Sequence, residues 1–345
     1  MVELSSEPEE PATHGEESPV SGEALAFWVR EPGVGEIRPE VLRQPADDEV
    51  LVRTVVSGVS RGTEALVFRG GVPASQHASM RAPFQEGDFP GPVKYGYLNV
   101  GVVERGPAAL LGRTVFCLFP HQTRFVVPVA AITVVPDEIP ASRAVLAGTV
   151  ETAVNALWDA APLVGDRVAI VGAGMVGCAI AGLVARYPGV NVTLVDVDPA
   201  RARIAETLGV EFALPGGVEE ERDLVFHTSA QGAGLQLSLD LLATEGTVID
   251  LSWYGDADVA LSLGAAFHSR RLSIRASQVG MVSPARRGRR SMADRLALAL
   301  DLLRNPVFDG LISGESMFAE LPEVMPKLAD GSMPALCHTI TYDEG

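Results

Sequence analysis

Residues 166–177 read Asp-Arg-Val-Ala-Ile-Val-Gly-Ala-Gly-Met-Val-Gly, so three glycines follow an apolar run at once. The run predicts a buried strand, and residues 178–186 predict a helix directly after the glycines. A second apolar run, Val190–Val195, comes next. Such glycines permit a tight turn and close approach of the backbone to a pyrophosphate, which the free N–H groups of the helix start face. We therefore predict dinucleotide binding rather than a purely structural turn, with contacts from Gly172, Gly174, Met175, Val176 and Gly177.

Asp196 ends the second apolar run, about 20 residues after the glycines. A carboxylate at this place accepts hydrogen bonds from the adenosine ribose hydroxyls and repels a 2′-phosphate. No Arg follows directly, because the next residues are Val197, Asp198 and Pro199. The sequence therefore favours NAD over NADP. The alternative is an ordinary turn or helix-capping Asp, which Asp198-Pro199 also suits.

The composition is typical of a globular protein of two domains. Of the 345 residues, 47% are hydrophobic and 21% are charged. No apolar run reaches the roughly 18–20 residues that span a bilayer, and no signal peptide is visible. Three widely spaced cysteines, Cys117, Cys178 and Cys337, support neither a disulfide framework nor a structural zinc cluster. We expect a cytoplasmic protein.

The net charge of −17 argues against non-specific binding to nucleic acid. Six glutamates among Pro, Ser and Gly contribute to it within residues 1–22. This stretch has almost no apolar content and predicts a disordered acidic tail. A functional tail is the alternative.

Short strands at regular spacing predict a small β-barrel-like domain in the first third of the chain. Residues 69–92, rich in Gly, Pro and polar groups, predict a long loop between them. The expected strands are Ala24–Arg30, Glu49–Gly58, Asn99–Glu104, Thr114–Phe119 and Thr123–Pro128.

From Ser142 onward helices alternate with strands, which predicts a parallel, doubly wound sheet. A helix at 144–158 leads into the glycine turn, and a helix at 234–243 lies between the later strands 223–229 and 247–252. A strand at 272–277, helices at 293–303 and 321–328, and a last strand at 338–342 complete the chain. We place the domains at 1–22 (tail), 23–145 (catalytic), 146–282 (NAD-binding Rossmann) and 283–345 (a segment that returns to complete the catalytic domain).

Over roughly residues 24–343 the sequence resembles the medium-chain dehydrogenase/reductase superfamily of the zinc alcohol dehydrogenases. Val56-Ser-Gly-Val-Ser-Arg-Gly-Thr-Glu64 is similar to the turn that carries its first catalytic zinc ligand, Gly96–Glu104 to its Gly-His-Glu segment, and Ala147–Leu157 to the segment of the third ligand. The Ser-Arg-Gly-Thr-Glu wording is nearest the bacteriochlorophyllide-dehydrogenase-like branch. The resemblance implies an α/β fold in which a Rossmann sheet accompanies a GroES-like β-barrel catalytic domain, an NAD cofactor and a homodimer.

The three ligand positions of this family carry Ser60, Tyr97 and Ala147 in this chain, and Leu98 replaces the neighbouring acid. Catalytic zinc is held by Cys and His, and none of these three residues is a good zinc ligand at neutral pH. The four-cysteine lobe of the structural zinc is also missing. We expect no catalytic zinc.

Hydride transfer from a nicotinamide still needs a group that gives or takes the proton. Tyr97 and Ser60, at the places of the zinc ligands, are the candidates, and Thr63 matches the family's proton-relay hydroxyl. The alternative is that Tyr97 is a core aromatic and that the two hydroxyls belong to a turn. As a base Tyr97 would need a cationic neighbour, and Lys94 is the nearest in sequence.

The resemblance also suggests further cofactor contacts, each with a packing or surface role as its alternative. Arg61 matches a basic position at the pyrophosphate, and Arg201 a cation that flanks the ribose. The remaining candidates end strands of the Rossmann sheet, with Ser277–Val279 near the nicotinamide amide: Ser229, Ala230, Ser252, Trp253, Ser277, Gln278 and Val279.

A basic stretch begins at His268 in this acidic chain and includes Arg270, Arg271, Arg275, Arg286, Arg287, Arg289, Arg290 and Arg295. It predicts either a solvated loop and helix start or recognition of an anionic substrate. His121 is either a proton carrier or, as is commoner for a lone His, structural.

These observations predict a zinc-independent, NAD(H)-dependent oxidoreductase that interconverts an alcohol and a carbonyl on a small organic molecule, in a cleft between two domains. Neither nucleic acid nor membrane is an expected partner. The alternatives are a zinc-free enone or quinone reductase of the same superfamily and a dinucleotide-binding protein without catalysis.

Overall fold

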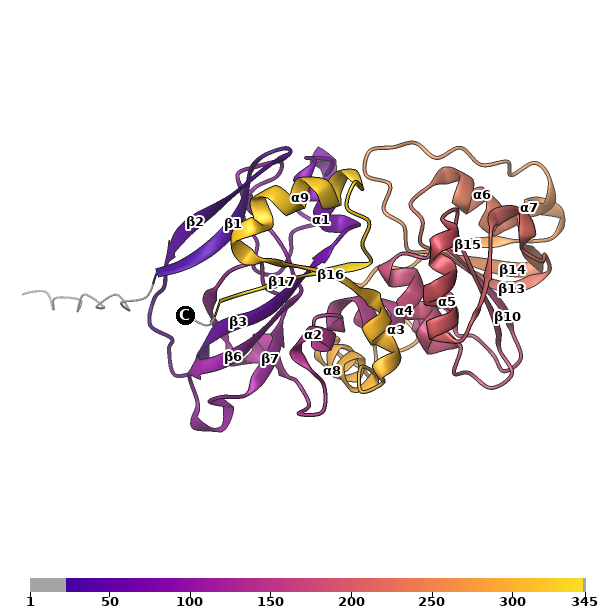
Figure 1. The fold of residues 1–345 in the computed structure, drawn as a ribbon. Helices are drawn as coiled ribbons and strands as arrows, with labels where there is room; N and C mark the ends of the chain where they lie inside the picture. Colours follow the sequence, from indigo (N-terminus) through magenta and orange to yellow (C-terminus); the bar gives the residue numbers. More distant parts are fainter. Residues whose placement is uncertain (1–22, 344–345) are drawn as a thin grey trace, which may run out of the picture.

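The computed structural model describes residues 23–343, which form two lobes lying side by side (Figure 1). The predicted acidic tail, residues 1–22, lies outside the described residues, as do residues 344–345. One lobe holds β1, β3, β6 and β17, and the other holds β10, β13 and β14.

The second lobe is built on a six-stranded parallel sheet. Its strand order is β12 (Glu211–Ala213), β11 (Asn191–Val195), β10 (Arg167–Val171), β13 (Arg222–His227), β14 (Leu242–Asp250) and β15 (Ser273–Ala276). The helices that alternate with these strands are α4 (Met175–Val184), α5 (Ala202–Leu208), α6 (Gly232–Asp240) and α7 (Ala266–Ser269). The order reverses between β10 and β13, which is the crevice where such sheets bind nucleotides. The predicted doubly wound Rossmann sheet is confirmed.

The first lobe carries two sheets that are antiparallel except where β16 runs parallel to β17. The seven-stranded sheet contains β16 (Ile312–Met317), β17 (Cys337–Thr341), β3 (Glu49–Ser60), β6 (Asn99–Arg105), β7 (Thr114–Cys117), β9 (Ile132–Val134) and β8 (Arg124–Pro128). The four-stranded sheet contains β2 (Val34–Val41), β1 (Glu23–Glu31), β5 (Val93–Lys94) and β4 (Glu86–Gly87). Helices α1 (Thr63–Phe68) and α9 (Leu321–Asp330) pack against each other beside these sheets (Figure 1). This is the predicted GroES-like component of the fold.

Two details differ from the sequence-based expectation. The helix expected at 234–243 ends at Asp240, because Leu242 already pairs with Arg222 in the parallel sheet. No hydrophobic pattern predicts β2, whose Val34–Val41 sequence is half polar and contains Pro39. β2 is an edge strand, where a proline removes no essential ladder hydrogen bond.

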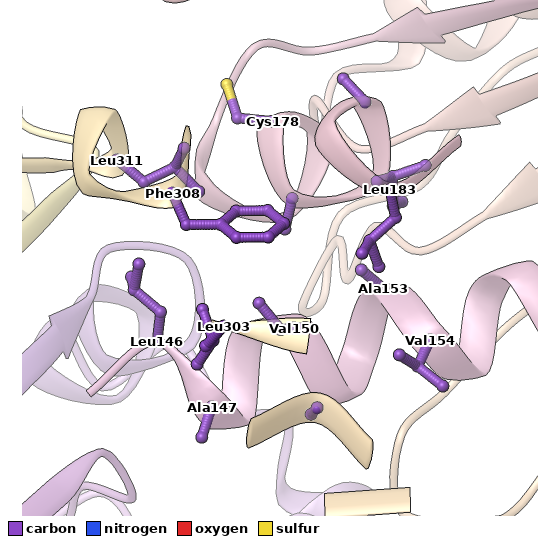
Figure 2. Packing of buried hydrophobic residues seen from close by; sticks show 14 of the residues in the cluster. Leu146, Ala147, Val150, Ala153, Val154, Cys178, Leu183, Leu303, Phe308 and Leu311 are labelled. Carbon is purple, nitrogen blue, oxygen red and sulfur yellow. The ribbon is translucent and has the colours of Figure 1, made fainter. Parts of the chain in front are cut away.

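One hydrophobic cluster runs through both lobes and is organised by α3 (Ala147–Ala160). Figure 2 shows Val150, Ala153 and Val154 of α3 beneath α4, with Phe308 of η6 (Pro306–Leu311) between the two helices. Helix α8 (Met292–Leu302) also packs on α3. At the other end of α3, a Cβ added to Gly148 would lie 2.7 Å from Leu98 Cδ2 of the first lobe. Helix α3 therefore fixes the two lobes relative to each other.

The remaining short helices are α2 (Ala141–Ala144), η1 (Ala74–Gln76), η2 (Ala108–Leu110), η3 (Val129–Ala131), η4 (Pro199–Arg201), η5 (Pro215–Gly217) and η7 (Phe318–Glu320). Across residues 23–343, none of the helices has the length and apolar character needed to cross a membrane.

Candidate active site

The glycine turn between β10 and α4 is closed by backbone contacts that a side chain would prevent. Gly172 has φ +115°, in the region that favours glycine. A Cβ at Gly177 would lie 2.0 Å from the Gly172 carbonyl oxygen, and one at Gly172 would lie 2.7 Å from the Ser229 nitrogen. Gly174, which precedes Met175 at the start of α4, makes no side-chain cap. The turn thus leaves backbone N–H groups of a helix start for an anion, which fits a pyrophosphate.

Asp196 follows β11 directly and holds the glycine turn through its carboxylate. Its Oδ2 accepts a hydrogen bond from the Ala173 N–H at 2.7 Å, and its Oδ1 accepts one from the Asp198 N–H at 2.9 Å. The capping role belongs to Asp198, whose Oδ1 accepts the Ala200 N–H at 2.9 Å. Asp196 is half-buried beside the turn.

Arg61 and Arg201 approach each other from different lobes. Arg61 donates to the Ala335 carbonyl at 2.8 Å, while its buried Nε has no hydrogen-bond partner among the described residues. Arg201 pairs with Asp198 at 3.4 Å. Burial lowers the pKa of Arg61, and the charge of Arg201 lowers it further. Two cations held this close form a site that an anion such as a pyrophosphate would stabilise.

The predicted contacts at the ends of β13 and β14 are joined by a residue that the sequence analysis did not single out. His227 is buried, with Nε2 2.8 Å from Ser229 Oγ and Nδ1 2.9 Å from Asp250 Oδ1. Ser252 Oγ lies 3.1 Å from the same Nδ1 and accepts the Ala230 N–H at 3.0 Å. Ser229 and Ser252 were singled out because each ends a strand. That criterion does not reveal the buried imidazole between them.

Ser60, Thr63 and Tyr97 come together, although they lie on different segments. Both hydroxyls lie close enough to the phenol of Tyr97 to affect its ionisation. Burial raises the pKa of Tyr97 to about 12, and the nearby Glu64 carboxylate adds to the shift, while the hydroxyls of Ser60 and Thr63 oppose it. At neutral pH the phenol is therefore protonated and suited to donate rather than to accept a proton.

Lys94 is not the cationic neighbour that a tyrosinate base would need. Its ammonium lies 2.5 Å from Glu86 Oε1 and 2.8 Å from Gln122 Oε1, and 5.8 Å from the ring of Trp28. Lys94 belongs to β5 of the four-stranded sheet, where its side chain meets these partners instead.

Behind Tyr97 lies a buried hydrogen-bonded chain that the sequence pattern does not reveal. Glu64 Oε1 accepts the Ser60 N–H at 2.9 Å, and its Oε2 lies 2.9 Å from His121 Nε2. His121 Nδ1 lies 2.7 Å from Ser57 Oγ, which lies 2.7 Å from the Tyr342 hydroxyl. His121 is thus a member of a polar network and not an isolated core histidine.

The residues at the family's zinc positions do not fit a zinc ion. Ser60 and Tyr97 offer a hydroxyl and a phenol, and Ala147 offers no donor atom. Within the part of the chain that the structure describes, no three His, Cys, Asp or Glu side chains are grouped to hold a metal.

The basic stretch divides into buried and exposed parts. Arg295 is buried against Glu151, and Arg275 pairs with Asp159. Arg270 and Arg271 make surface ion pairs with Glu221 and Glu245. Arg286, Arg289 and Arg290 remain exposed and line one shallow hollow. The stretch therefore combines structural ion pairs with exposed arginines.

The sequence was compared with protein-family models and with curated proteins. Residues 167–213 match the family described as 3-hydroxyacyl-CoA dehydrogenase, NAD binding domain. No curated protein matches the sequence.

Several solved structures match almost the whole chain. L-idonate 5-dehydrogenase from Escherichia coli superimposes with a TM-score of 0.76 at 16% identity, over 93% of this chain and 98% of that one. A short chain alcohol dehydrogenase from Escherichia coli, complexed with NADH, gives 0.73 at 15% identity, over 93% and 100%. For 2R,3R-butanediol dehydrogenase from Bacillus subtilis the values are 0.72 and 14%, over 93% and 100%. The chain thus has the fold of these dehydrogenases, and its first Rossmann strands match a family model for an NAD-binding domain.

Proposed function

We propose that the protein is a zinc-independent, NAD(H)-dependent oxidoreductase that interconverts an alcohol and a carbonyl on a small organic molecule. The proposal is supported above all by the cluster of Tyr97, Ser60 and Thr63, in which the phenol is protonated at neutral pH. By the sequence resemblance, Ser60 and Tyr97 correspond to positions where the family holds its metal. The same fold carries a glycine turn that fits a dinucleotide.

The cofactor would supply the hydride from its nicotinamide ring. In this proposal the turn from Gly172 to Gly177 and the first N–H groups of α4, at Met175 and Val176, hold the pyrophosphate. Arg61 neutralises phosphate charge, Asp196 binds the ribose hydroxyls, and Arg201 flanks that ribose. Further contacts come from Ser229, Ser252, Ser277 and Val279 at the strand ends.

Tyr97 would act as the general acid. In the reductive direction its O–H would donate a hydrogen bond to the substrate carbonyl oxygen and then give that oxygen the proton of the alcohol hydroxyl. The phenolate left behind would take up a proton from water before the next turnover. Ser60 and Thr63 hold the phenol oxygen, and the high pKa keeps its proton in place until the oxygen becomes basic. No step in this scheme needs a metal.

Finer features of the protein are also proposals. NAD specificity is supported by Asp196 and by the absence of Arg among Val197, Asp198 and Pro199. An anionic substrate is supported by the exposed arginines at 286, 289 and 290. Domain limits at 23–145, 146–282 and 283–345, a homodimer and a cytoplasmic location rest on the family resemblance and on cysteine usage.

The test is cofactor turnover by the purified protein with a panel of alcohols and carbonyl compounds, with and without a strong chelator. We expect NADH oxidation or NAD⁺ reduction with at least one pair, unchanged by the chelator. Loss of activity on chelation, together with one zinc per chain by elemental analysis, would show that the alignment of the three zinc positions is wrong. Tight NADH binding without turnover on any substrate would favour a non-catalytic dinucleotide-binding protein.

A further inference from the structure

Helix α3 has a polar face in addition to the apolar face seen in Figure 2. Glu151, Asn155 and Asp159 are spaced four residues apart, so they stack along one side of the helix. All three are buried, and between them they hold the segment from Arg275 to Ser283.

Asp159 and Asn155 bind different parts of the segment from Arg275 to Ser283. Asp159 Oδ2 accepts the Ser277 hydroxyl at 2.7 Å, and the Asp159 carbonyl accepts Arg275 Nη1 at 2.8 Å. Asn155 Oδ1 accepts the Ser283 N–H at 3.0 Å, and its Nδ2 donates to the Gln278 carbonyl at 3.3 Å.

Glu151 acts through Arg295 of α8. Arg295 Nε donates to Glu151 Oε1 at 3.0 Å, and Nη1 donates to Asn155 Oδ1 at 2.6 Å. The same guanidinium donates to the carbonyls of Val279 and Met281. One buried arginine thereby ties α3, α8 and the loop together.

Stability alone is a poor reason for this arrangement. Arg295 is 1% exposed, and burial raises the pKa of the Glu151 carboxyl despite the opposing effect of Arg295. Buried ion pairs seldom stabilise a fold more than apolar residues of the same shape would. The pair does fix the path of the loop, because the loop carbonyls of Val279 and Met281 accept hydrogen bonds from the Arg295 guanidinium.

The loop and Tyr97 are connected through the same helix. Gly148, at the start of α3, packs closely on Leu98, since a Cβ there would lie 2.7 Å from Leu98 Cδ2, and Leu98 follows Tyr97 in the chain. The polar face begins three residues later. Helix α3 therefore contacts the segment that carries the phenol at one end and the loop at the other.

We propose that Glu151, Asn155 and Asp159, with Arg295, form a clamp that fixes the loop Ser277–Ser283 relative to Tyr97, and so sets where the nicotinamide lies. The four are positioning residues. The proposal rests on the proposed function, since it takes Ser277 and Val279 as cofactor contacts.

The test is the paired replacement Glu151→Leu/Arg295→Met, which removes both charges while keeping most of the volume. The matched control is Arg143→Met/Asp309→Leu. It removes another ion pair, at 2.6 and 2.7 Å, whose guanidinium also bonds the Leu303 carbonyl but does not touch the loop. Three quantities are measured: the melting temperature, the amide exchange of residues 278–283 without cofactor, and the NADH dissociation constant by fluorescence.

We expect the paired replacement to weaken NADH binding roughly tenfold, because the loop must then be ordered on binding. The amide exchange rates of residues 278–283 should rise by a similar factor. The control variant Arg143→Met/Asp309→Leu should change neither these rates nor NADH affinity. Equal exchange and affinity in the two double variants would overturn the clamp. If the wild-type protein does not bind NADH, the proposed function fails, but the exchange comparison still decides the clamp. If the paired variant does not fold, Asp159→Asn takes its place. We then expect NADH affinity to fall roughly threefold, and an unchanged affinity would contradict the clamp.

Discussion

The glycine turn of the Rossmann lobe and the Tyr97 cluster of the β-rich lobe are specified in different ways. The turn is made by contiguous residues, and its decisive contact joins Gly177 to Gly172 within one motif. The Tyr97 cluster is assembled from β3, α1, the segment before β6 and the segment after β7. A site of the first kind is visible in the sequence. A site of the second kind depends on strand pairing, so its chemistry changes when one distant partner changes.

Tyr97→Phe is the replacement with the largest expected effect. Loss of the phenol hydroxyl should lower kcat by roughly 10²–10⁴, the range for a general acid, while NADH affinity stays unchanged. The ring keeps its edge-on contact with Tyr95, so folding should be retained. Steady-state kinetics and an NADH titration measure the two quantities. If kcat hardly moves, Tyr97 is a packing residue and the cluster is not the catalytic site.

Two glycine replacements test whether the turn from Gly172 to Gly177 serves folding, cofactor binding or both. Gly177→Ala puts a Cβ against the Gly172 carbonyl and should lower the free energy of unfolding by about 3 kcal/mol, the upper range for overpacking. Gly174→Ala meets nothing within 4 Å, so the melting temperature should not change. NADH binding should nevertheless weaken, because the new methyl group stands where the pyrophosphate approaches. Unchanged NADH binding by Gly174→Ala would leave the turn with a structural role only.

Asp196→Ala tests cofactor choice within the contiguous site. The wild-type protein should bind NADH more tightly than NADPH. In the variant the ratio of the two dissociation constants should fall roughly tenfold, because the ribose loses its hydrogen bonds to the carboxylate and the 2′-phosphate is no longer repelled. Because Asp196 also holds the Ala173 and Asp198 N–H groups, Asp196→Asn is the control that retains an acceptor. Calorimetric titration with both cofactors measures the ratio. Equal affinity in the wild-type protein would refute NAD specificity.

The pH profile of carbonyl reduction tests the assembled site and should show the smallest effect. The pKa of Tyr97 is raised to about 12, so the acid form persists below that value and the rate should not fall between pH 7 and 10 on its account. Glu64→Gln removes a negative charge that raises this pKa, so any alkaline fall should begin at lower pH, by roughly one unit. Ser57→Ala, at the far end of the His121 contact, should not shift the profile. An alkaline fall centred near pH 8 in the wild-type enzyme would contradict the assignment of Tyr97.

The Rossmann sheet, the glycine turn and the place of Asp196 could all be predicted from the amino-acid sequence. Each depends on local spacing: apolar runs for buried strands, glycines where a Cβ would clash, and a carboxylate at a strand end. The sequence also showed that Ser60, Tyr97 and Ala147 carry the wrong donor atoms for zinc.

The neighbours of these residues depend on the tertiary structure. Lys94 is three residues from Tyr97, yet strand pairing puts its ammonium beside Glu86, whereas the Ser60 hydroxyl, 37 positions away, lies beside the phenol. His121, Glu64, His227 and Arg295 showed no sequence pattern of their own, because a buried polar side chain is defined by the partners that satisfy it. Those partners come from segments up to 144 residues away, as for Arg295 and Glu151, and no local periodicity encodes such a pairing.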